Sequence, residues 1–328
     1  MSDLVIRLLQ SSICFGTVIM YGAIGEILTE KSGNLNLGVP GIMYLGGISG
    51  LAASFFYEFN NPDPNGLVCL LISFLAAFLV SALGGLFYSF LTITLRANQN
   101  VTGLTLTIFG GGIANFFGGS LNTMAGGVGQ ISVATTSAVY RATIPGLSGL
   151  GVVGKLIFNY GFMVYLAIVL AVVMHWFLNR TRKGLNLRAV GENPATADAA
   201  GINVTRNKYL ATCIGAGISG LGGLYYTMDY IKGTWANDGT IESLGWLAVA
   251  LVIFATWRSV NAIWGSYLFG FLFWVYLIIP GLARKDIELF KMLPYLVTIA
   301  VLIITSLRKK RENQPPASLG LAYFREER

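Results

Sequence analysis

Two runs of residues have the spacing of nucleotide-binding motifs. Gly149, Gly154 and Lys155 match the start of a phosphate-binding loop, but Leu156 stands where that loop needs a serine or threonine to hold magnesium. The glycines of Gly215–Gly220 have the spacing of a dinucleotide fingerprint, but they lie within an apolar run and follow no soluble strand. Small residues at this spacing let transmembrane helices approach closely. We therefore expect no nucleotide-hydrolysing site in this chain.

The residues that commonly bind metals or act as nucleophiles are scattered. His175 is the single histidine, and it lies beside Trp176, which is typical of an interfacial aromatic belt. The cysteines stand alone in apolar stretches, without the spacing of a disulfide framework or a metal site; they are Cys14, Cys69 and Cys213. We expect a protein that is not an enzyme, with no catalytic residues, no bound metal and no cofactor.

The composition is that of a membrane protein. Of the 328 residues 54% are hydrophobic and 11% charged, and the mean hydropathy is +0.65, whereas soluble domains carry about 25% charged residues. The apolar residues come in runs of about twenty, the length of a transmembrane helix. We predict a single all-α, polytopic transmembrane domain over residues 1–328. Its nine expected spans are residues 8–28, 38–57, 67–95, 100–118, 157–178, 208–230, 241–257, 261–280 and 290–307.

The net charge of +7 is concentrated beside these runs. One basic block extends from Arg180 to Lys208, and another from Arg308 to Arg311. Positive residues mark the cytoplasmic side of a membrane protein. We therefore expect an external amino terminus and a cytoplasmic carboxyl tail, and no binding of nucleic acid.

Two segments outside the spans are long enough to describe separately. Residues 119–156 are rich in Gly, Ser and Thr and contain no acidic residue. Loops of this length are uncommon without a purpose, so this external region is either a cap or re-entrant element, or a loosely ordered connector. The cytoplasmic tail, residues 308–328, contains Pro315 and Pro316. We expect it to be mobile and to act only as an electrostatic anchor.

A short internal similarity indicates a possible inverted repeat. Residues Ser81–Tyr88 and Ser219–Tyr226 share the pattern Ser-x-Leu-Gly-Gly-Leu-aromatic-Tyr. In the predicted topology the two copies cross the membrane in opposite directions, as in inverted-repeat transporters. Chance similarity in a chain rich in Gly and Leu is the alternative.

An irregular segment opens the second span. Ser32–Gly41 contains three glycines, two asparagines and Pro40. Gly and Pro interrupt a helix and leave backbone groups that lipid cannot satisfy. Such breaks mark substrate paths in transporters; the alternative is an ordinary turn that caps the span. Glu26 lies in the preceding span, where a charge is costly. It could face a cavity, pair with a base such as Lys31, or lie nearer the interface; we expect the last of these.

Amide side chains occur in the fourth span. Asn100 and Asn115 could hydrogen-bond the hydroxyls of a neutral polar solute without the desolvation cost of a charge. They could equally hold helices together.

The basic segment of residues 180–207 predicts a short helix on the cytoplasmic face. Asn193 is a good N-cap, Pro194 suits the first helical position, and Gly201 ends the helix. A connector between spans does not need such a helix. We therefore interpret residues 194–200 as a docking surface for a soluble partner.

Glu30–Gly41 and Gly184–Val204 resemble segments of the permease subunits of ATP-binding-cassette (ABC) importers of the branched-chain amino acid and ribose group. Within that group they look most like the nucleoside or simple-sugar permeases used with Bmp-type binding lipoproteins. The run Gly245–Phe254 is also similar to this subfamily, and the resemblance covers residues 20–305. Pro40 departs from the pattern, since the related chains more often have an acidic or small residue there.

The resemblance implies a multi-pass protein of the bacterial cytoplasmic membrane. An external binding lipoprotein would deliver a nucleoside, and a separate cytoplasmic ABC ATPase would dock on the 194–200 helix. A second, different permease chain is expected to complete the channel.

Two sets of residues are expected to carry these functions. The substrate path is expected to include Asn34, Asn36, Gly38, Gly41, Asn100, Asn115 and Trp246. Coupling to the ATPase is expected to involve Arg188, Gly191, Glu192, Asn193, Pro194, Ala197, Asp198 and Gly201.

Alternatives remain open. A simple sugar of the ribose type is the other substrate that the resemblance allows. An ion-coupled secondary transporter would need carboxylates or histidines within its spans, and Glu26 is the only carboxylate well inside a predicted span. A purely structural scaffold would not explain the capped cytoplasmic helix.

Overall fold

The computed structural model describes residues 2–126, 131–143, 151–279, 281, 284–308 and 314–325. Within these ranges the chain is helical and contains no β-strand, apart from one isolated bridge between Ser132 and Thr234. The predicted all-α class is confirmed.

Each expected span corresponds to one long helix. These helices are α1 (Ser2–Lys31), α2 (Val39–Asn60), α3 (Gly66–Ser89), α4 (Gln99–Met124), α7 (Phe162–Arg180), α10 (Val204–Tyr225), α11 (Thr240–Phe254), α12 (Ser259–Trp274) and α14 (Leu293–Arg308). In the described part of the chain, seven helical segments are long and apolar enough to cross a membrane. α11 is apolar but shorter, and α10 begins with the basic residues Arg206 and Lys208.

Short helices connect the long ones. They are α5 (Ala134–Tyr140), α6 (Gly151–Ile157), α8 (Arg182–Glu192), α9 (Pro194–Ala199), α13 (Arg284–Lys291) and the 3₁₀ turn η3 (Val275–Ile278). The region 119–156 is partly ordered, since α4 continues to Met124 and α5 packs against α3. The side chain of Glu58 accepts hydrogen bonds from Thr136 N and Oγ1, at 2.7 and 2.6 Å. The described part of this region is therefore ordered, and its role as a cap or re-entrant element stays a prediction.

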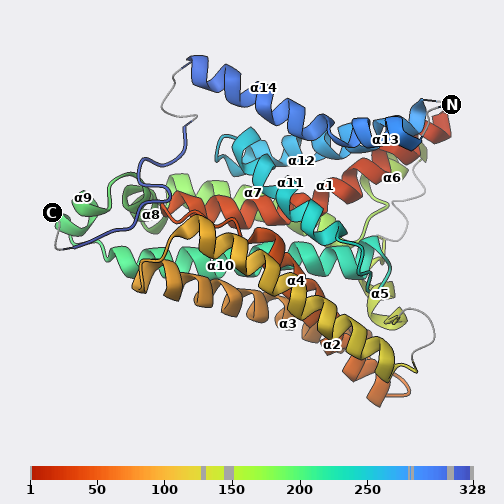
Figure 1. Ribbon diagram of the computed structural model, residues 1–328. Coiled ribbons are helices and arrows are strands. Elements are labelled where there is room, and N and C mark those ends of the chain that lie inside the picture. The colour runs from red at the N-terminus through yellow and green to blue at the C-terminus, as the bar shows by residue number, and fades with distance from the viewer. Residues whose placement is uncertain are drawn as a thin grey trace.

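The bundle is built around α1 (Figure 1). This helix runs through the middle and contacts α7, α10, α11 and α12. α10 also packs on α2 and α3, α4 packs mainly on α2, and α14 lies along the outside against α11 and α12. The chain thus surrounds its first helix with the later ones.

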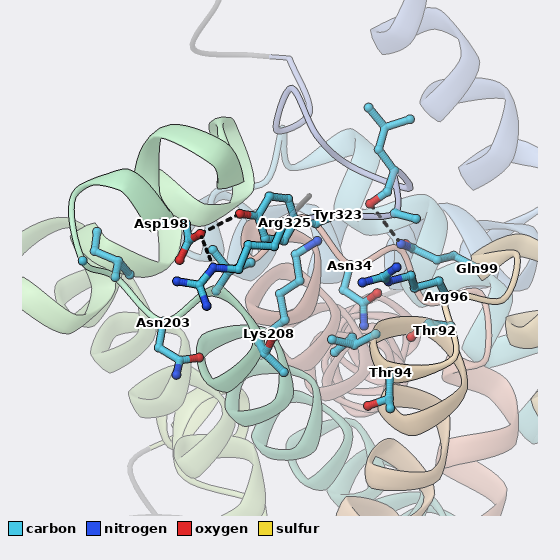
Figure 2. A pocket seen from close by; sticks show the side chains of 17 residues that line it. Asn34, Thr92, Thr94, Arg96, Gln99, Asp198, Asn203, Lys208, Tyr323 and Arg325 are labelled. Atoms are coloured by element: carbon cyan, nitrogen blue, oxygen red, sulfur yellow. Dashed lines mark hydrogen bonds and ion pairs between the residues drawn. The ribbon is translucent and has the colours of Figure 1, made fainter. Parts of the chain in front are cut away.

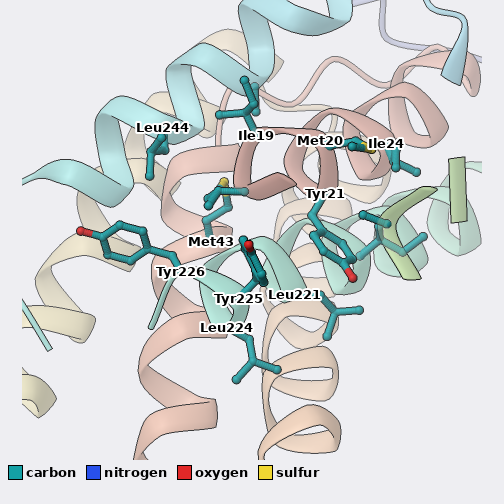
Figure 3. Packing of buried hydrophobic residues seen from close by; sticks show 14 of the residues in the cluster. Ile19, Met20, Tyr21, Ile24, Met43, Leu221, Leu224, Tyr225, Tyr226 and Leu244 are labelled. Atoms are coloured by element: carbon teal, nitrogen blue, oxygen red, sulfur yellow. The ribbon is translucent and has the colours of Figure 1, made fainter. Parts of the chain in front are cut away.

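Glycines allow the inner helices to pack closely. A Cβ added at Gly46 of α2 would lie 2.2 Å from the backbone oxygen of Gly220 in α10, and one added at Gly25 of α1 would lie 2.2 Å from the oxygen of Gly215. The fingerprint-like glycines of α10 are therefore helix-packing residues, as expected. Large side chains fill the space around these contacts, among them Tyr21 and Tyr225 (Figure 3).

The two copies of the internal similarity lie on α3 and α10. These helices pack against each other, and the chain follows them in opposite directions (Figure 1). A π-helical turn follows each of these helices. The turn η1 (Phe90–Thr94) comes just after the first copy, and the second copy ends at the first residue of η2 (Tyr226–Tyr230). The shared geometry supports the inverted-repeat interpretation.

The connections gather at two opposite ends of the bundle. One end carries residues 32–38, α8, α9 and the carboxyl-terminal segment (Figure 1). We call it the basic end, because the block from Arg180 to Lys208 lies there, and it is the end predicted to be cytoplasmic. The amino terminus, α5, α6 and α13 lie at the other end.

Candidate functional site

The predicted cytoplasmic helix is present as α9, joined to α8 by Asn193. The Oδ1 atom of Asn193 accepts a hydrogen bond from Thr196 N at 3.0 Å, so the expected N-cap is confirmed. Pro194 is the first helical residue, and Gly201 follows the helix with φ of 81°. Thr181 caps α8 in the same way, accepting from Gly184 N at 3.0 Å. Two rigidly capped short helices therefore form one hairpin.

The outer face of α9 is exposed. Thr196, Ala199 and Ala200 are exposed, whereas Ala197 is only 3% exposed and packs with Val190. A partner that binds α9 would therefore contact the exposed three residues and not Ala197.

The segment of residues 32–38 is a buried turn at the basic end. The Asn36 backbone N–H donates to Glu26 Oε1 at 3.0 Å, and Asn36 Oδ1 accepts from Gly38 N at 2.9 Å. Asn34 Nδ2 donates to Thr212 Oγ1 of α10 at 3.0 Å. The carboxylate of Glu26 is buried beneath this turn, at the basic end of the bundle. The free-energy cost of burying this carboxylate is offset by the hydrogen bond from the Asn36 backbone N–H.

The described part of the carboxyl-terminal tail, residues 314–325, is bound to this end. Ser318 N and Oγ both donate to the Gly191 carbonyl oxygen, at 3.0 and 2.6 Å. Tyr323 OH donates to Asp198 Oδ2 at 2.9 Å, and Arg325 Nε lies 3.2 Å from the same oxygen. The expectation of a mobile tail is wrong for these residues, because specific hydrogen bonds and a buried Ser318 hold them.

A cavity of about 540 Å³ lies between the tail, α10 and the start of α4 (Figure 2). Its polar and charged lining consists of Asn34, Thr92, Thr94, Arg96, Gln99, Asp198, Asn203, Thr205, Lys208, Tyr323 and Arg325. Gln99 ties two walls together, since Gln99 Oε1 accepts from Leu35 N at 2.7 Å and its Nε2 donates to the Leu321 carbonyl at 3.5 Å.

The residues expected to couple to an ATPase do gather at this end, with different exposures. Arg188, Glu192, Asn193 and Gly201 are exposed, Pro194 and Asp198 are partly covered, and Gly191 and Ala197 are buried. Gly191 allows α8 to approach the end of α1 closely, because a Cβ added there would lie 2.3 Å from the Lys31 carbonyl oxygen. Gly191, Ala197 and Asp198 are therefore placed to position the hairpin.

The residues expected to line a substrate path do not form one site in this chain. Asn34 and Asn36 belong to the buried turn, and Asn34 also lines the cavity. Gly38 and Gly41 pack on Leu106 of α4.

The other three expected path residues lie elsewhere. Asn100 and Asn115 are exposed on α4, and Trp246 is half-buried on α11. A common path would need a second surface that brings these regions together.

Comparison with known proteins identifies the family. Residues 8–302 match the family described as branched-chain amino acid transport system, permease component. The chain belongs to this permease family. Family membership also favours the ABC importer over the ion-coupled transporter. The all-helical architecture and the membrane-spanning helices are those of a multi-pass protein of the cytoplasmic membrane.

Three relatives of the permease match it along most of its length. It is 31% identical to a chain named as a glucose ABC transporter permease, TsgC13 of Haloferax volcanii, over 97% of this chain and 98% of the relative. It is 30% identical to the nucleoside ABC transporter permease NupC of Lactococcus lactis, over 90% and 91%. It is 29% identical to the guanosine ABC transporter permease NupQ of Bacillus subtilis, over 90% of each chain. No solved structure gave a significant match.

Sequence reasoning missed two features of the permease's basic end. Lys208 is buried against the cavity, although its position beside a span indicated only topology. The tail contacts were also missed. The Tyr323 and Arg325 side chains that make them follow a proline-containing polar stretch, which by itself resembles a disordered segment.

Proposed function

We propose that this permease is the membrane subunit of an ABC importer that takes up nucleosides. The observation that carries the proposal is similarity along about nine-tenths of the chain to two permeases whose names specify nucleosides and guanosine. The match to the chain named for glucose is as strong, so a simple sugar is the second candidate. In either case the solute is neutral and polar.

A separate ATPase is proposed to dock on α9. The helix is short, capped at Asn193 and exposed at Thr196 and Ala199. It follows α8 and precedes α10, and α10 packs on α1, α2 and α3 in the centre of the bundle. Movement of α9 would therefore be transmitted directly to the helices around α1, which is what ATP-driven alternating access requires.

A second permease chain is proposed to cover the free face of α4. Asn115 is exposed there, sixteen residues after Gln99 and so about 24 Å along the helix. An amide at that depth is costly in contact with lipid. Gly112 and Gly119, one turn to either side, have no atom within 4 Å of an added Cβ. Small residues beside a polar one are typical of helix interfaces in membranes.

This arrangement would also place the path between two chains. Asn115 would face a solute or the partner at that interface, and an external binding lipoprotein would deliver the nucleoside to it. The inward side would open near the buried turn that contains Asn34 and Asn36.

Reconstituted transport tests the proposal. The permease, candidate ATPase and second permease subunits, and a candidate binding lipoprotein are placed in proteoliposomes, and uptake of labelled guanosine and glucose is measured. We expect ATP-dependent guanosine uptake that is lost with an ATPase variant unable to hydrolyse ATP. Glucose uptake alone would give the function to the second candidate. Uptake by the permease alone, driven by an ion gradient, would contradict an ABC importer.

A further inference from the structure

The cavity at the basic end has an excess of positive charge. Arg96, Lys208 and Arg325 line it, whereas Asp198 is the one acidic side chain among its lining residues in the described part of the chain. Asp198 is already bound by Tyr323 and Arg325. The remaining two cations face the cavity without an acidic partner there (Figure 2).

Lys208 is the most constrained of these cations. It is 3% exposed, and its side chain extends from α10 into the cavity (Figure 2). Within the described ranges it makes no hydrogen bond and no ion pair. An ammonium group with buried surroundings is stabilised by an acceptor or an anion. Among the described residues, Lys208 Nζ is not one of the fully buried polar atoms that lack a partner, so the ammonium group is open to the cavity, where an anion can reach it.

The other walls of the cavity also favour an anion. α10 begins there at Val204, and the amino-terminal end of a 22-residue helix attracts negative charge. Thr92 and Thr94 also line the cavity, but their hydroxyls are already paired: Thr92 Oγ1 donates to the Tyr88 carbonyl oxygen at 2.9 Å, and Thr94 Oγ1 lies 2.5 Å from Tyr209 OH. Arg96 adopts a left-handed backbone with φ of 58°, and its guanidinium lies 4.4 Å from the centre of the Phe324 ring.

We propose that this cavity binds a phosphate monoester on the predicted cytoplasmic side of the membrane. A phosphate monoester carries a charge of about −1.5 to −2 at neutral pH, which matches three cations and one carboxylate. The guanidinium of Arg96 and the ammonium of Lys208 suit phosphate oxygens. A volume of about 540 Å³ is enough for the rest of a small molecule.

The ligand would connect the carboxyl-terminal tail to α10. Leu321, Tyr323 and Arg325 of the tail form one wall of the cavity, and Lys208 of α10 forms another. An anion between them would hold the tail against α10 and thereby against Asp198 of α9. The site shares Asn34 with the proposed inward opening of the path, but it lies far along α4 from Asn115, and its binding of phosphate can be assayed without an ATPase.

Direct binding to the purified full-length permease tests the assignment. The permease is placed in phosphatidylcholine nanodiscs and titrated calorimetrically with inorganic phosphate and with adenosine 5′-monophosphate; adenosine is the uncharged control. We expect both phosphates to bind and adenosine not to compete. Lys208→Met should weaken binding at least tenfold, and Lys208→Arg should restore part of it.

A matched variant and a stability measurement keep the result interpretable. Arg182→Gln removes an exposed cation of α8 outside the cavity and should leave binding unchanged. Phosphate should raise the thermal unfolding temperature of the wild type, because it binds the folded state, but not that of Lys208→Met. Without phosphate, Lys208→Met should keep the thermal stability of the wild type, since Lys208 makes no hydrogen bond or ion pair within the described ranges that the substitution would remove.

A lipid source of the same group is tested in parallel. Nanodiscs containing phosphatidic acid are compared with phosphatidylcholine alone, and native mass spectrometry measures retained phosphatidic acid. Retention that depends on Lys208 would assign the site to a lipid phosphate; competition by soluble phosphate would assign it to a free ester. If no probe binds, or if Arg182→Gln weakens binding as much as Lys208→Met, the proposal is wrong. The proposal is also wrong if Lys208→Met loses ATPase binding but binds phosphate as the wild type does.

Discussion

At the scale of single residues, glycine contacts set the spacing of the inner helices. Gly46 meets the Gly220 backbone of α10, and a Cβ there would lie 2.5 Å from the Gly220 Cα atom. Because the nearest atoms are backbone, the two helices must separate to admit a methyl group. Gly112 has open space around it.

We therefore expect Gly46→Ala to destabilise the permease by about 1–3 kcal/mol through overpacking. Gly112→Ala should have no such effect on the isolated chain, and its higher helix propensity should make it neutral or slightly stabilising. Thermal unfolding of the detergent-solubilised proteins measures both. Equal melting temperatures for the two variants would contradict the close packing of α2 on α10.

Asn34 is a second informative residue, because it both holds a turn and lines a cavity. Its Nδ2 donates to Thr212 Oγ1, while its Oδ1 has no hydrogen-bond partner within the described ranges. Asn34→Leu should abolish uptake while the ATPase still assembles. Thr212→Val removes only the hydrogen bond between the Asn34 side chain and α10.

Comparison of the two variants in the transport assay separates the two roles. If Asn34 contacts solute, Thr212→Val should retain far more uptake than Asn34→Leu. If both variants lose uptake equally, the role of Asn34 is to hold the turn on α10.

At the scale of elements, the α8–α9 hairpin and the tail act as one unit. Ala199 is on the exposed face of α9, and Asn60 is exposed at the opposite end of the bundle. Ala199→Trp should reduce ATPase binding at least tenfold, whereas Asn60→Trp should leave it unchanged. Affinity is measured with the ATPase immobilised and the permease in nanodiscs. Full binding by Ala199→Trp would remove α9 from the docking surface.

The tail should order the hairpin that it covers. A chain ending at Asn313 lacks the contacts of Ser318 with Gly191 and of Tyr323 with Asp198. Amide hydrogen exchange in residues 188–203 should then become faster, because opening costs less free energy. Tyr323→Phe, which removes one hydrogen bond, should give a smaller change. Unchanged exchange in the truncated chain would mean that the hairpin is stable without the tail.

At the scale of the whole molecule, one face of the bundle remains without a partner. The exposed stripe on α4 includes Ile108, Gly112 and Asn115. In a background without the native cysteines, Ile108→Cys should cross-link to the second permease in membranes. Leu302→Cys, exposed on α14, should not. Cross-linking from α14 and none from α4 would move the interface to the other side of the bundle.

The features that could be predicted from the sequence are those set by local chemistry. The cap at Asn193, the proline after it and the glycine at 201 act within one helical turn, so α9 was predicted almost to the residue. Apolar runs and basic blocks were likewise sufficient for the long helices.

The contacts that could not be predicted join distant parts of the chain. Tyr323 and Asp198 are 125 residues apart, and no spacing rule connects them. The position of Lys208 in the sequence is also explained by the positive residues that flank transmembrane spans on the cytoplasmic side. Only the packing of the turn, α10 and the tail makes it a buried cation. Whether the expected path residues meet a solute depends on a second chain, which this sequence does not contain.

The hydrogen bond between Tyr323 and Asp198 can form only when α9 and the tail lie on the same side of the membrane. Between α9 and the tail the chain passes through α10, α11, α12 and α14. The tail reaches Asp198 only if these helices make an even number of crossings. A chain in which one of them failed to insert would carry its last residues to the opposite side of the bilayer and leave α9 uncovered. The tail thus covers the α8–α9 hairpin only in a permease whose helices are all inserted. A factor that binds the uncovered hairpin could therefore distinguish misinserted subunits from correctly inserted ones.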